Sequence, residues 1–347
     1  MIQIVYDISV IICAYTEQRW HDLTAAVTSA QQQSIPAREI IVVIDHNPAL
    51  LQRAREQLRD VTVIENRLAK GLSGARNSGV AVAQGLVVAF LDDDASAQSD
   101  WLEHLAAAYT HANVLGVGGR IDPRWLKLRR PAWFPEEFNW VVGCSYRGLP
   151  TENAPVRNLI GANMSFRRDV LVTIGGFREA FGCNKGGNTG STSFSWLQHS
   201  AGDEETELCI RATRTWPGGL WIYAPAARVQ HNASAQRARW KYFLWRCYDE
   251  GLGKALLVQI HDARTGLASE RSYVFKTLPK GVLRGMTDTF LRFDPAGLGR
   301  SIAILLGLAA TVAGYLIGKA FLTPEERGHD IQGSGLPSIS RVEEGIH

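Results

Sequence analysis

Cysteine is scarce in this chain of 347 residues, and the few cysteines are not arranged in pairs. There are five of them, an odd number, scattered along the sequence without a C-x-x-C motif. That arrangement argues against a disulfide framework and against a cysteine-based zinc site. It is typical of a protein that stays in a reducing cytosol.

Excess charge, nucleic-acid motifs and a leader are also missing. The formal net charge is only +3, and no RNA- or DNA-binding motif occurs, so we expect no nucleic-acid partner. Residues 1–7 have neither a basic stretch nor a cleavage site, and we expect no signal peptide. The chain is 46% apolar and 20% charged, as is usual for a globular protein with a sizeable core.

Short apolar runs alternate with helical patterns in the first third of the chain. The patterns predict five strands and four helices there, in alternation; the strands are 8–13, 39–44, 61–64, 86–91 and 114–117, and the helices 22–33, 51–58, 74–83 and 101–109. Repeated units of this kind predict a parallel sheet with helices on both faces. Further along, we expect a helix over 204–212, a strand over 220–223 and a basic, aromatic helix over 235–260.

Three adjacent carboxylates, Asp92, Asp93 and Asp94, directly follow the apolar run 86–91. A run without alternation predicts a strand buried on both faces, and ligands of open α/β sheets bind at the carboxyl ends of such strands. Asp92 and Asp94 could hold one hard divalent cation together with a diphosphate. A solvated acidic turn before the next helix remains the alternative for the triplet taken alone.

Other polar segments also follow predicted strands. Ala14, Tyr15 and Glu17 come after the first strand and Asp45 after the second, while the glycine-rich segment 70–77 precedes the fourth. Each signal is weak alone. Together they place a carboxylate, the cation Arg76 and a metal site around one crevice, which suits a nucleotide diphosphate.

The ordered motifs resemble family 2 glycosyltransferases with the GT-A fold, over roughly residues 7–250. The motifs that carry this resemblance are 9–15 (SVIICAY), 71–77 (GLSGARN), 90–94 (FLDDD), 161–167 (GANMSFR), 175–177 (GGF) and 204–208 (EETEL). The resemblance implies a Rossmann-like mixed sheet with helices on both faces. It also implies an inverting, metal-dependent transfer of a sugar from a UDP-sugar.

Site roles follow from the same resemblance. Asp92 and Asp94 form the DxD motif that holds Mg²⁺ or Mn²⁺, with His231 as a further ligand. The general base lies in the pair Glu204-Glu205, and we expect Glu205 to take that role, although the family usually has Asp there, which leaves Asp203 and Glu204 as alternatives. The expected donor-binding residues are Ala14, Tyr15, Glu17, Asp45, Gly71, Ser73, Arg76, Asn77, Asp92 and Asp93. Those expected on the sugar and acceptor side are Gly161, Ala162, Asn163, Gly176 and Phe177.

A narrower resemblance concerns the donor and the acceptor. Segments 119–121 (GRI), 130–138 (RPAWFPEEF) and 157–163 (RNLIGAN) look like a branch that includes glucosyl-dolichyl phosphate glucuronosyltransferases. That implies UDP-glucuronate as donor and a polyprenyl-phosphate-linked or surface-glycan acceptor. Candidate cations for the glucuronate carboxylate are Arg120, Arg157 and Arg167; Trp125, Trp133, Phe134 and Trp140 are candidates for sugar stacking or for the core.

The C-terminal part of the chain suggests membrane attachment. Residues 302–318 carry no charge and follow a basic stretch, which favours the cytoplasmic face and a single C-terminal anchor; a core helix docked on the domain is the alternative. We therefore expect a transferase domain over 1–234 (nucleotide half 1–118, acceptor half 119–234), a basic helical extension over 235–300, a membrane-associated helix over 301–322 and a disordered tail over 323–347.

Two rival functions remain. A sugar nucleotidyltransferase shares a related sheet, but would carry a basic glycine-rich loop where this chain has residues 14–17. A catalytically silent scaffold that binds UDP-sugars is supported only by Glu205 standing where the family usually has Asp.

Overall fold

The computed structural model describes residues 7–125, 129–179, 204–261 and 270–321. These residues fall into two compact units, the first within 1–120 and 152–230 and the second within 121–151 and 231–324. The expected tail 323–347 lies outside the described residues, as do residues 180–203. Each unit is described below by itself.

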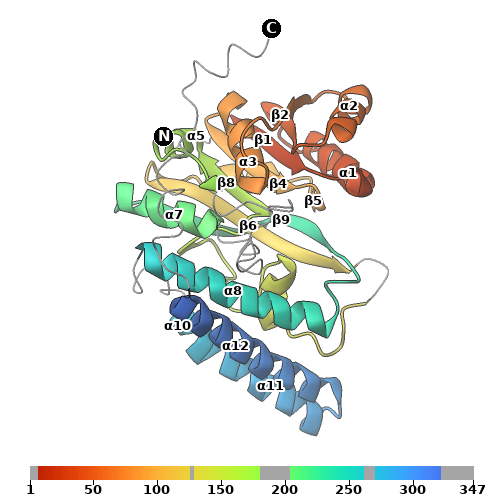
Figure 1. Cartoon of the computed structure of the whole chain (residues 1–347), viewed down its shortest axis with the longest axis vertical. Helices are drawn as coiled ribbons and strands as arrows, with labels where there is room; N and C mark the ends of the chain where they lie inside the picture. The colour runs from red at the N-terminus through yellow and green to blue at the C-terminus, as the bar shows by residue number, and fades with distance from the viewer. Residues whose placement is uncertain (1–6, 126–128, 180–203, 262–269, 322–347) are drawn as a thin grey trace. The chain divides into compact units, whose positions relative to one another are not determined.

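Four parallel strands form one side of the sheet in the first unit (Figure 1). They are β1 (Ile8–Ala14), β2 (Glu39–Ile44), β3 (Thr62–Glu65) and β4 (Val87–Asp92), in the order β3-β2-β1-β4. The register pairs Cys13 of β1 with Asp92 of β4 and Ala14 with Ile44 of β2. The three strand ends therefore meet at one edge, followed by Tyr15, Asp45 and Asp93.

Beyond β4 the sheet becomes antiparallel. Strand β8 (Asn163–Arg167) lies between β4 and β6 (Val114–Trp125) and runs antiparallel to both. Three further strands complete the nine-stranded sheet of the described residues: β9 (Leu220–Ala233), β5 (Ala95–Ala97) and β7 (Ala154–Val156). The prediction of a purely parallel sheet is therefore wrong beyond β4. The strand that lies beside β4 is β8, which comes from later in the chain and runs antiparallel to it. The mixed α/β fold class is confirmed.

The helices of the first unit cover this sheet. They are η1 (Glu17–Arg19), α1 (Trp20–Gln31), α2 (Pro48–Gln57), α3 (Leu72–Val82), α4 (Trp101–Ala107), α5 (Arg168–Thr173) and α7 (Glu204–Thr215). Helix α3 packs closely on β1 and β2, since a Cβ atom at Gly79 would lie 2.7 Å from Ile11. Phe90, Phe166 and Phe177 fill the core with edge-on ring contacts at 5.4 to 6.1 Å. The edge where β1, β2 and β4 end is therefore supported by a tightly packed core.

The second unit is mostly helical. Its elements are η2 (Glu136–Val142), α8 (Trp240–His261), α10 (Glu270–Ser272), η4 (Tyr273–Thr277), α11 (Leu278–Leu291) and α12 (Ala296–Phe321). Helix α12 packs along both α8 and α11 (Figure 1). An aromatic cluster forms the core beside η2: Trp133 stacks on Trp240 at 4.0 Å, and Phe134 and Phe138 meet Phe243. This cluster uses Trp133 and Phe134 for packing, the alternative role considered for them.

Candidate active site

The carboxylate triplet stands at the end of the central strand β4. Asp92 is the last residue of the strand, and Asp93 and Asp94 are buried in the turn that leads into β5. A carboxylate oxygen of Asp92 and one of Asp94 lie within 4.8 Å of each other. Two hard oxygen donors this close are the ligand type that Mg²⁺ and Mn²⁺ prefer.

Arg19, which the sequence analysis missed, faces the triplet. Its Nη1 atom lies 2.9 Å from Asp93 and 3.3 Å from Asp94. Even so, burial, together with the charges of Asp94 and Asp92, outweighs Arg19 and raises the pKa of Asp93 to about 7. Asp93 Oδ2 is buried and accepts no hydrogen bond within the described residues. Arg19 thus does not fully offset the negative charge around Asp93, and a bound divalent ion fits this donor set.

Asp45 anchors the glycine-rich loop at the end of β2. Its carboxylate accepts hydrogen bonds from Asn66 Nδ2 at 2.6 Å and from the backbone N–H of Gly71 at 3.0 Å. Gly71 has a φ of 129°, a backbone conformation that favours glycine. Asn66 directly follows β3, so the end-of-strand rule that pointed to Asp45 could also have found it. Asp45 therefore fixes the start of α3, where Ser73 and Arg76 lie.

Arg76 is the buried centre of the site. Its guanidinium lies 3.0 Å from Glu204 Oε1 and 3.6 Å from Asp92 Oδ1 and donates to the carbonyl of Gly161 at 3.4 Å. Burial alone would lower the pKa of Arg76, but Glu204, Asp92 and Glu205 more than offset it and raise the pKa. A Cβ atom at Gly161 would lie 3.7 Å from Glu205 Oε1. One cation thus joins the triplet, the segment at Gly161 and the first turn of α7.

Two asparagines of the predicted site hold the backbone together. Asn77 donates to the carbonyl of Phe177 and accepts from its N–H, both at 2.8 Å. Asn163 donates to the carbonyls of Arg120 and Ala227 and accepts from Trp101 Nε1 at 2.7 Å. Phe177 is fully buried, and its ring packs against Phe90 in the core that supports the site. Contacts of Asn77, Asn163 and Phe177 with substrate stay predictions.

Arg167 lies at the wrong end of the sheet for the site. Because β8 runs antiparallel to β4, Arg167 pairs with Val87 at the start of β4, whereas Asp92 ends that strand. Its guanidinium donates to the carbonyls of Val114 and His111. Of the three candidate cations, Arg167 therefore does not neighbour the carboxylates.

Several residues predicted for the site are not among the contacts described above, and one of them lies outside the described residues. His231 belongs to the second unit, where its ring is buried beside Gly143 and its Nδ1 atom lies 3.8 Å from Cys144 Sγ. Its role as a metal ligand stays a prediction. Asp203, the alternative base, lies outside the described residues. At the end of β1, Ala14 is buried and Tyr15 is exposed, and Thr16 caps the 3-10 helix that begins at Glu17.

Known proteins similar to this chain match both its sequence and its fold. It is 30% identical over 324 residues to a glucosyl-dolichyl phosphate glucuronosyltransferase of Haloferax volcanii, covering 91% of this chain and 97% of that relative. It is 26% identical over 182 residues to a pre-mycofactocin glycosyltransferase of Mycobacterium tuberculosis, 52% of this chain and 34% of that one.

The fold also has a solved counterpart. A mannosyltransferase from Pyrobaculum calidifontis, solved in complex with GDP-Man and Mn²⁺, superimposes with a TM-score of 0.52 at 15% identity, covering 89% of this chain and 87% of that one. That likeness confirms the GT-A fold. Residues 9–175 match glycosyl transferase family 2. With the similarity that extends over nearly the whole Haloferax relative, the chain belongs to glycosyltransferase family 2 and is a hexosyltransferase.

Proposed function

We propose that the protein transfers glucuronate from UDP-glucuronate to a hydroxyl of a polyprenyl-phosphate-linked sugar, with inversion, at the cytoplasmic face of a membrane. The full-length similarity to a glucosyl-dolichyl phosphate glucuronosyltransferase supports the donor and the acceptor class. The buried pair Arg76–Glu204, with half-buried Asp92 and Glu205 beside it, is the observation that carries the reaction.

The donor nucleotide lies along the ends of β1, β2 and β4 in this proposal. Asp45 contacts the uracil, and Tyr15 and Glu17 flank the nucleotide. Ser73 supports this placement, because its hydroxyl is buried at the start of α3 without a hydrogen-bond partner among the described residues. A helix start also suits a diphosphate, whose charge the exposed backbone N–H groups stabilise.

Asp92, Asp94 and His231 hold Mn²⁺ or Mg²⁺ in this proposal. The close pair of carboxylate oxygens supports the first two ligands, and the mannosyltransferase of the same fold was solved with Mn²⁺. Gln98, four residues after Asp94, donates its backbone N–H to the carbonyl of Arg228 in strand β9. Arg228 stands three residues before His231 in the chain. When bound, the ion offsets the negative charge that develops on the departing UDP.

Glu205 acts as the general base. The acceptor oxygen attacks the anomeric carbon, the bond from that carbon to the diphosphate breaks, and the hydroxyl proton passes to the Glu205 carboxylate. Glu204 suits this role less well, because Arg76 holds its carboxylate at 3.0 Å. Glu204 is instead a positioning residue that fixes the first turn of α7, and Glu205 lies beside Gly161, where donor and acceptor meet.

Arg157 is the cation that we assign to the glucuronate carboxylate. Arg157 is half-buried and donates from Nε to Asn158 Oδ1 at 2.9 Å. It stands four residues before Gly161, which lies beside Glu205. Neither the position of Arg167 nor the exposed side chain of Arg120 gives comparable support.

A lipid-linked acceptor requires access to a membrane. Among the described residues one helix, α12, is long and apolar enough to cross a bilayer, with a mean hydropathy of 2.0 over its most apolar window. The basic residues of α11 and its approach favour the cytoplasmic face. The finding on α12 supports membrane attachment by length and composition only.

A panel of UDP-sugars tests the function directly. The purified chain is mixed with native lipid extract, each UDP-sugar and Mn²⁺ or Mg²⁺, and the lipid product is identified by mass and by the configuration at its new linkage. We expect addition of one glucuronate in the β configuration, which is the inverted product of the α-linked donor. Transfer of another sugar would overturn the donor assignment, retention would overturn the mechanism, and no transfer at all would favour the silent scaffold.

A further inference from the structure

Helix α12 is apolar all round in composition but has two different sides in the second unit. Its buried side is made mostly of small residues, among them Gly307, Gly314 and Gly318. The opposite side exposes a stripe of large aliphatic side chains, Ile302, Leu305, Leu306, Val312 and Leu316. Such a stripe is expected when one face of a helix meets protein and the other meets an apolar medium.

The buried side fixes α12 against α8 at backbone distance. A Cβ atom at Gly314 would lie 2.0 Å from the carbonyl oxygen of Tyr248, and one at Gly251 would lie 2.1 Å from that of Thr311. The two helices therefore touch along the second half of α12. Moving α12 away from α8 would remove the whole of this contact.

Helix α8 is too charged at this contact to enter hydrocarbon. Arg246 lies 3.2 Å from Asp249 and 3.5 Å from Glu250, and Lys254 lies 3.2 Å from Glu250 and 3.3 Å from Glu270. These ion pairs flank the residues that touch α12. If α12 crossed a bilayer while packed in this way, α8 would carry its charges into the membrane, which is strongly unfavourable.

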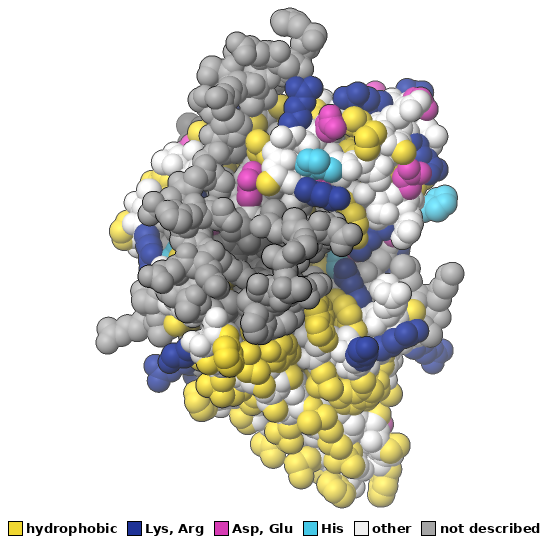
Figure 2. All heavy atoms as spheres, in the orientation of Figure 1, with side chains coloured by type: hydrophobic (Ala, Val, Ile, Leu, Met, Phe, Trp, Pro, Cys, Tyr) yellow, Lys and Arg dark blue, Asp and Glu magenta, His cyan; other side chains and the backbone are white. Residues whose placement is uncertain are grey.

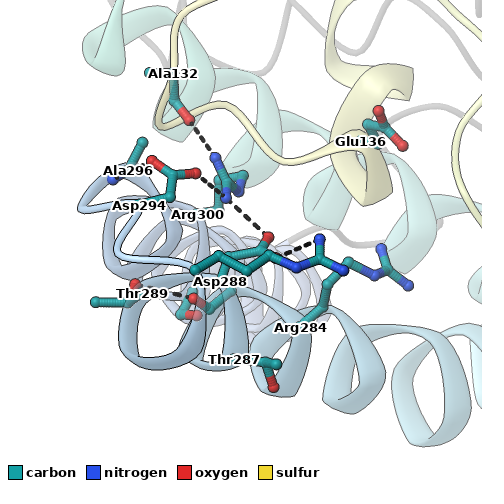
Figure 3. A network of polar contacts seen from close by, with 12 residues as sticks. Ala132, Glu136, Arg284, Thr287, Asp288, Thr289, Asp294, Ala296 and Arg300 are labelled. Atoms are coloured by element: carbon teal, nitrogen blue, oxygen red, sulfur yellow. Dashed lines mark hydrogen bonds and ion pairs between the residues drawn. The ribbon is translucent and has the colours of Figure 1, made fainter.

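The turn from α11 to α12 is locked by a polar network (Figure 3). Arg300 donates to Asp288 at 2.9 Å, to Asp294 at 2.7 Å and to the carbonyl of Ala132 at 3.2 Å. A Cβ atom at Gly297 would lie 2.3 Å from the carbonyl oxygen of Gly285. Helices α11 and α12 are thus held together as one antiparallel hairpin, and α12 is not an independent helix.

The tip of this hairpin exposes large apolar side chains. Phe290, Leu291 and Phe293 are 67%, 75% and 87% exposed. Phe293 also has a φ of 54°, in the left-handed region that a bulky residue rarely adopts. Figure 2 shows hydrophobic side chains gathered over the surface of this unit. A locked turn that holds aromatic rings outward is unexpected for a surface that faces only water.

Cations border the apolar surface. Lys276, Lys280 and Arg284 follow one another at intervals of four residues along η4 and α11, and all three are exposed. Arg284 is also paired with Glu137 at 2.8 Å, and Arg292 at the tip, whose side chain is 75% exposed, with Asp288 at 3.1 Å. Apolar stripes bordered by lysine and arginine match a bilayer with anionic headgroups, because the cations can reach the phosphates while the aliphatic side chains enter the acyl region.

We propose that the α11–α12 hairpin is an in-plane anchor that enters one leaflet of an anionic bilayer without crossing it. The exposed stripe of α12, the exposed Leu283 and Met286 of α11 and the tip contact lipid, and α8 stays on the water side. This inference deepens the membrane attachment of the proposed function and replaces a spanning α12. It assigns the lipid surface, not a second copy of the chain, as the occupant of this face.

Flotation with vesicles tests the contact surface. The full chain is mixed with vesicles of phosphatidylcholine alone or with a minority of phosphatidylglycerol, and the bound fraction is measured. We expect binding to the anionic vesicles, weakened about tenfold or more by Leu305→Glu combined with Leu316→Glu. The matched control is Leu86→Glu, which places the same charge at an exposed leucine of the first unit; it should bind like the wild type. Unchanged flotation of the double variant would overturn the assignment of this face.

Labelling from one side of the membrane tests whether α12 crosses. Lys319→Cys, near the end of α12, and Arg292→Cys, at the tip, are reacted with a membrane-impermeant maleimide in sealed vesicles that carry the catalytic unit outside, with wild type as background. An in-plane hairpin predicts labelling of both before detergent is added. Labelling of either cysteine only by maleimide enclosed inside the vesicles would show a crossing segment and overturn the proposal.

Two further readouts separate the remaining outcomes. A stable dimer in detergent-free solution that the double variant dissociates, with no flotation of the wild type, would assign the face to a second copy and overturn the proposal. Transfer to a short-chain acceptor in detergent should be equal in wild type and double variant, because neither leucine is among the residues of the proposed site. Absence of transfer in the wild type with normal flotation would refute the proposed function and leave the anchor intact.

Discussion

Arg76 Nη1 lies 3.0 Å from Glu204 Oε1, and both side chains are buried in the first unit. This pair ties the start of α7 to the end of β4, since the same guanidinium lies 3.6 Å from Asp92. The ion pair thereby joins the motif that contains Arg76 to the motif that contains Glu204. The position of the proposed base, Glu205, depends on it.

Replacement of Arg76 by Ala should be severe. Removal of one partner of a buried pair leaves an uncompensated carboxylate, which typically costs about 3–5 kcal/mol of unfolding free energy. Chemical denaturation of wild type, Arg76→Ala and Arg76→Lys should give that loss for Ala and a smaller one for Lys, which keeps the charge. Equal stability of all three proteins would contradict a structural role for the pair.

Loss of Asp94 should weaken metal binding. Asp94→Asn removes one of the two close carboxylates, and we expect Mn²⁺ affinity to fall at least about tenfold, because even outer-shell partners of a metal cost that much. Calorimetric titration with Mn²⁺ measures the affinity without relying on activity. Asp100→Asn is the matched control, an exposed acid at the start of α4. Wild-type affinity in Asp94→Asn would refute the ligand assignment.

Arg157 should govern the choice of donor. Arg157→Gln should lower kcat/KM for UDP-glucuronate about tenfold to a hundredfold, the range for loss of a hydrogen bond to a charged group. The value for UDP-glucose, which lacks the carboxylate, should change much less. Arg167→Gln, at the other end of the sheet, should leave the ratio between the two donors unaltered. A parallel decrease for both donors in Arg157→Gln would mean that Arg157 supports the fold instead.

Acid should weaken the turn of the α11–α12 hairpin through Asp294. The hydrogen bonds from Arg300 and from the N–H of Ala296 lower the pKa of Asp294 below its usual value. A carboxyl whose pKa is lower in the folded state contributes stability above its unfolded pKa and loses it as the pH falls through the folded value. The difference in Tm between wild type and Asp294→Asn should therefore be largest near neutral pH and shrink below about pH 4. A difference independent of pH would contradict this account.

The parts of the site that follow strand ends could be predicted from the sequence. Apolar runs located β1, β2 and β4 to within one or two residues, so Asp45 and the triplet were placed at the same edge of the sheet. The family motifs then supplied roles that spacing alone does not give. Local patterns were sufficient to place these residues because each of them directly follows its strand in the chain.

Contacts between distant segments could not be predicted in this way. Insertion of β8 beside β4 joins residues 72 to 80 positions apart, and no local pattern encodes that pairing. The same holds for Arg19 beside Asp93 and for Asn163, whose amide is fully used by three elements of the fold. Trp133 illustrates a different limit, since a tryptophan that could stack on sugar and one that stacks on Trp240 look alike in sequence.

The central claim is that Glu205 removes the proton of the acceptor hydroxyl, and Glu205→Gln tests it most directly. Single-turnover transfer from UDP-glucuronate to the lipid-linked acceptor is measured together with UDP affinity, with Glu65→Gln as an exposed control. The account predicts that Glu205→Gln loses transfer by a factor of at least about a hundred while UDP binds as tightly as to wild type. Transfer at the wild-type rate in Glu205→Gln would contradict it and move the base elsewhere.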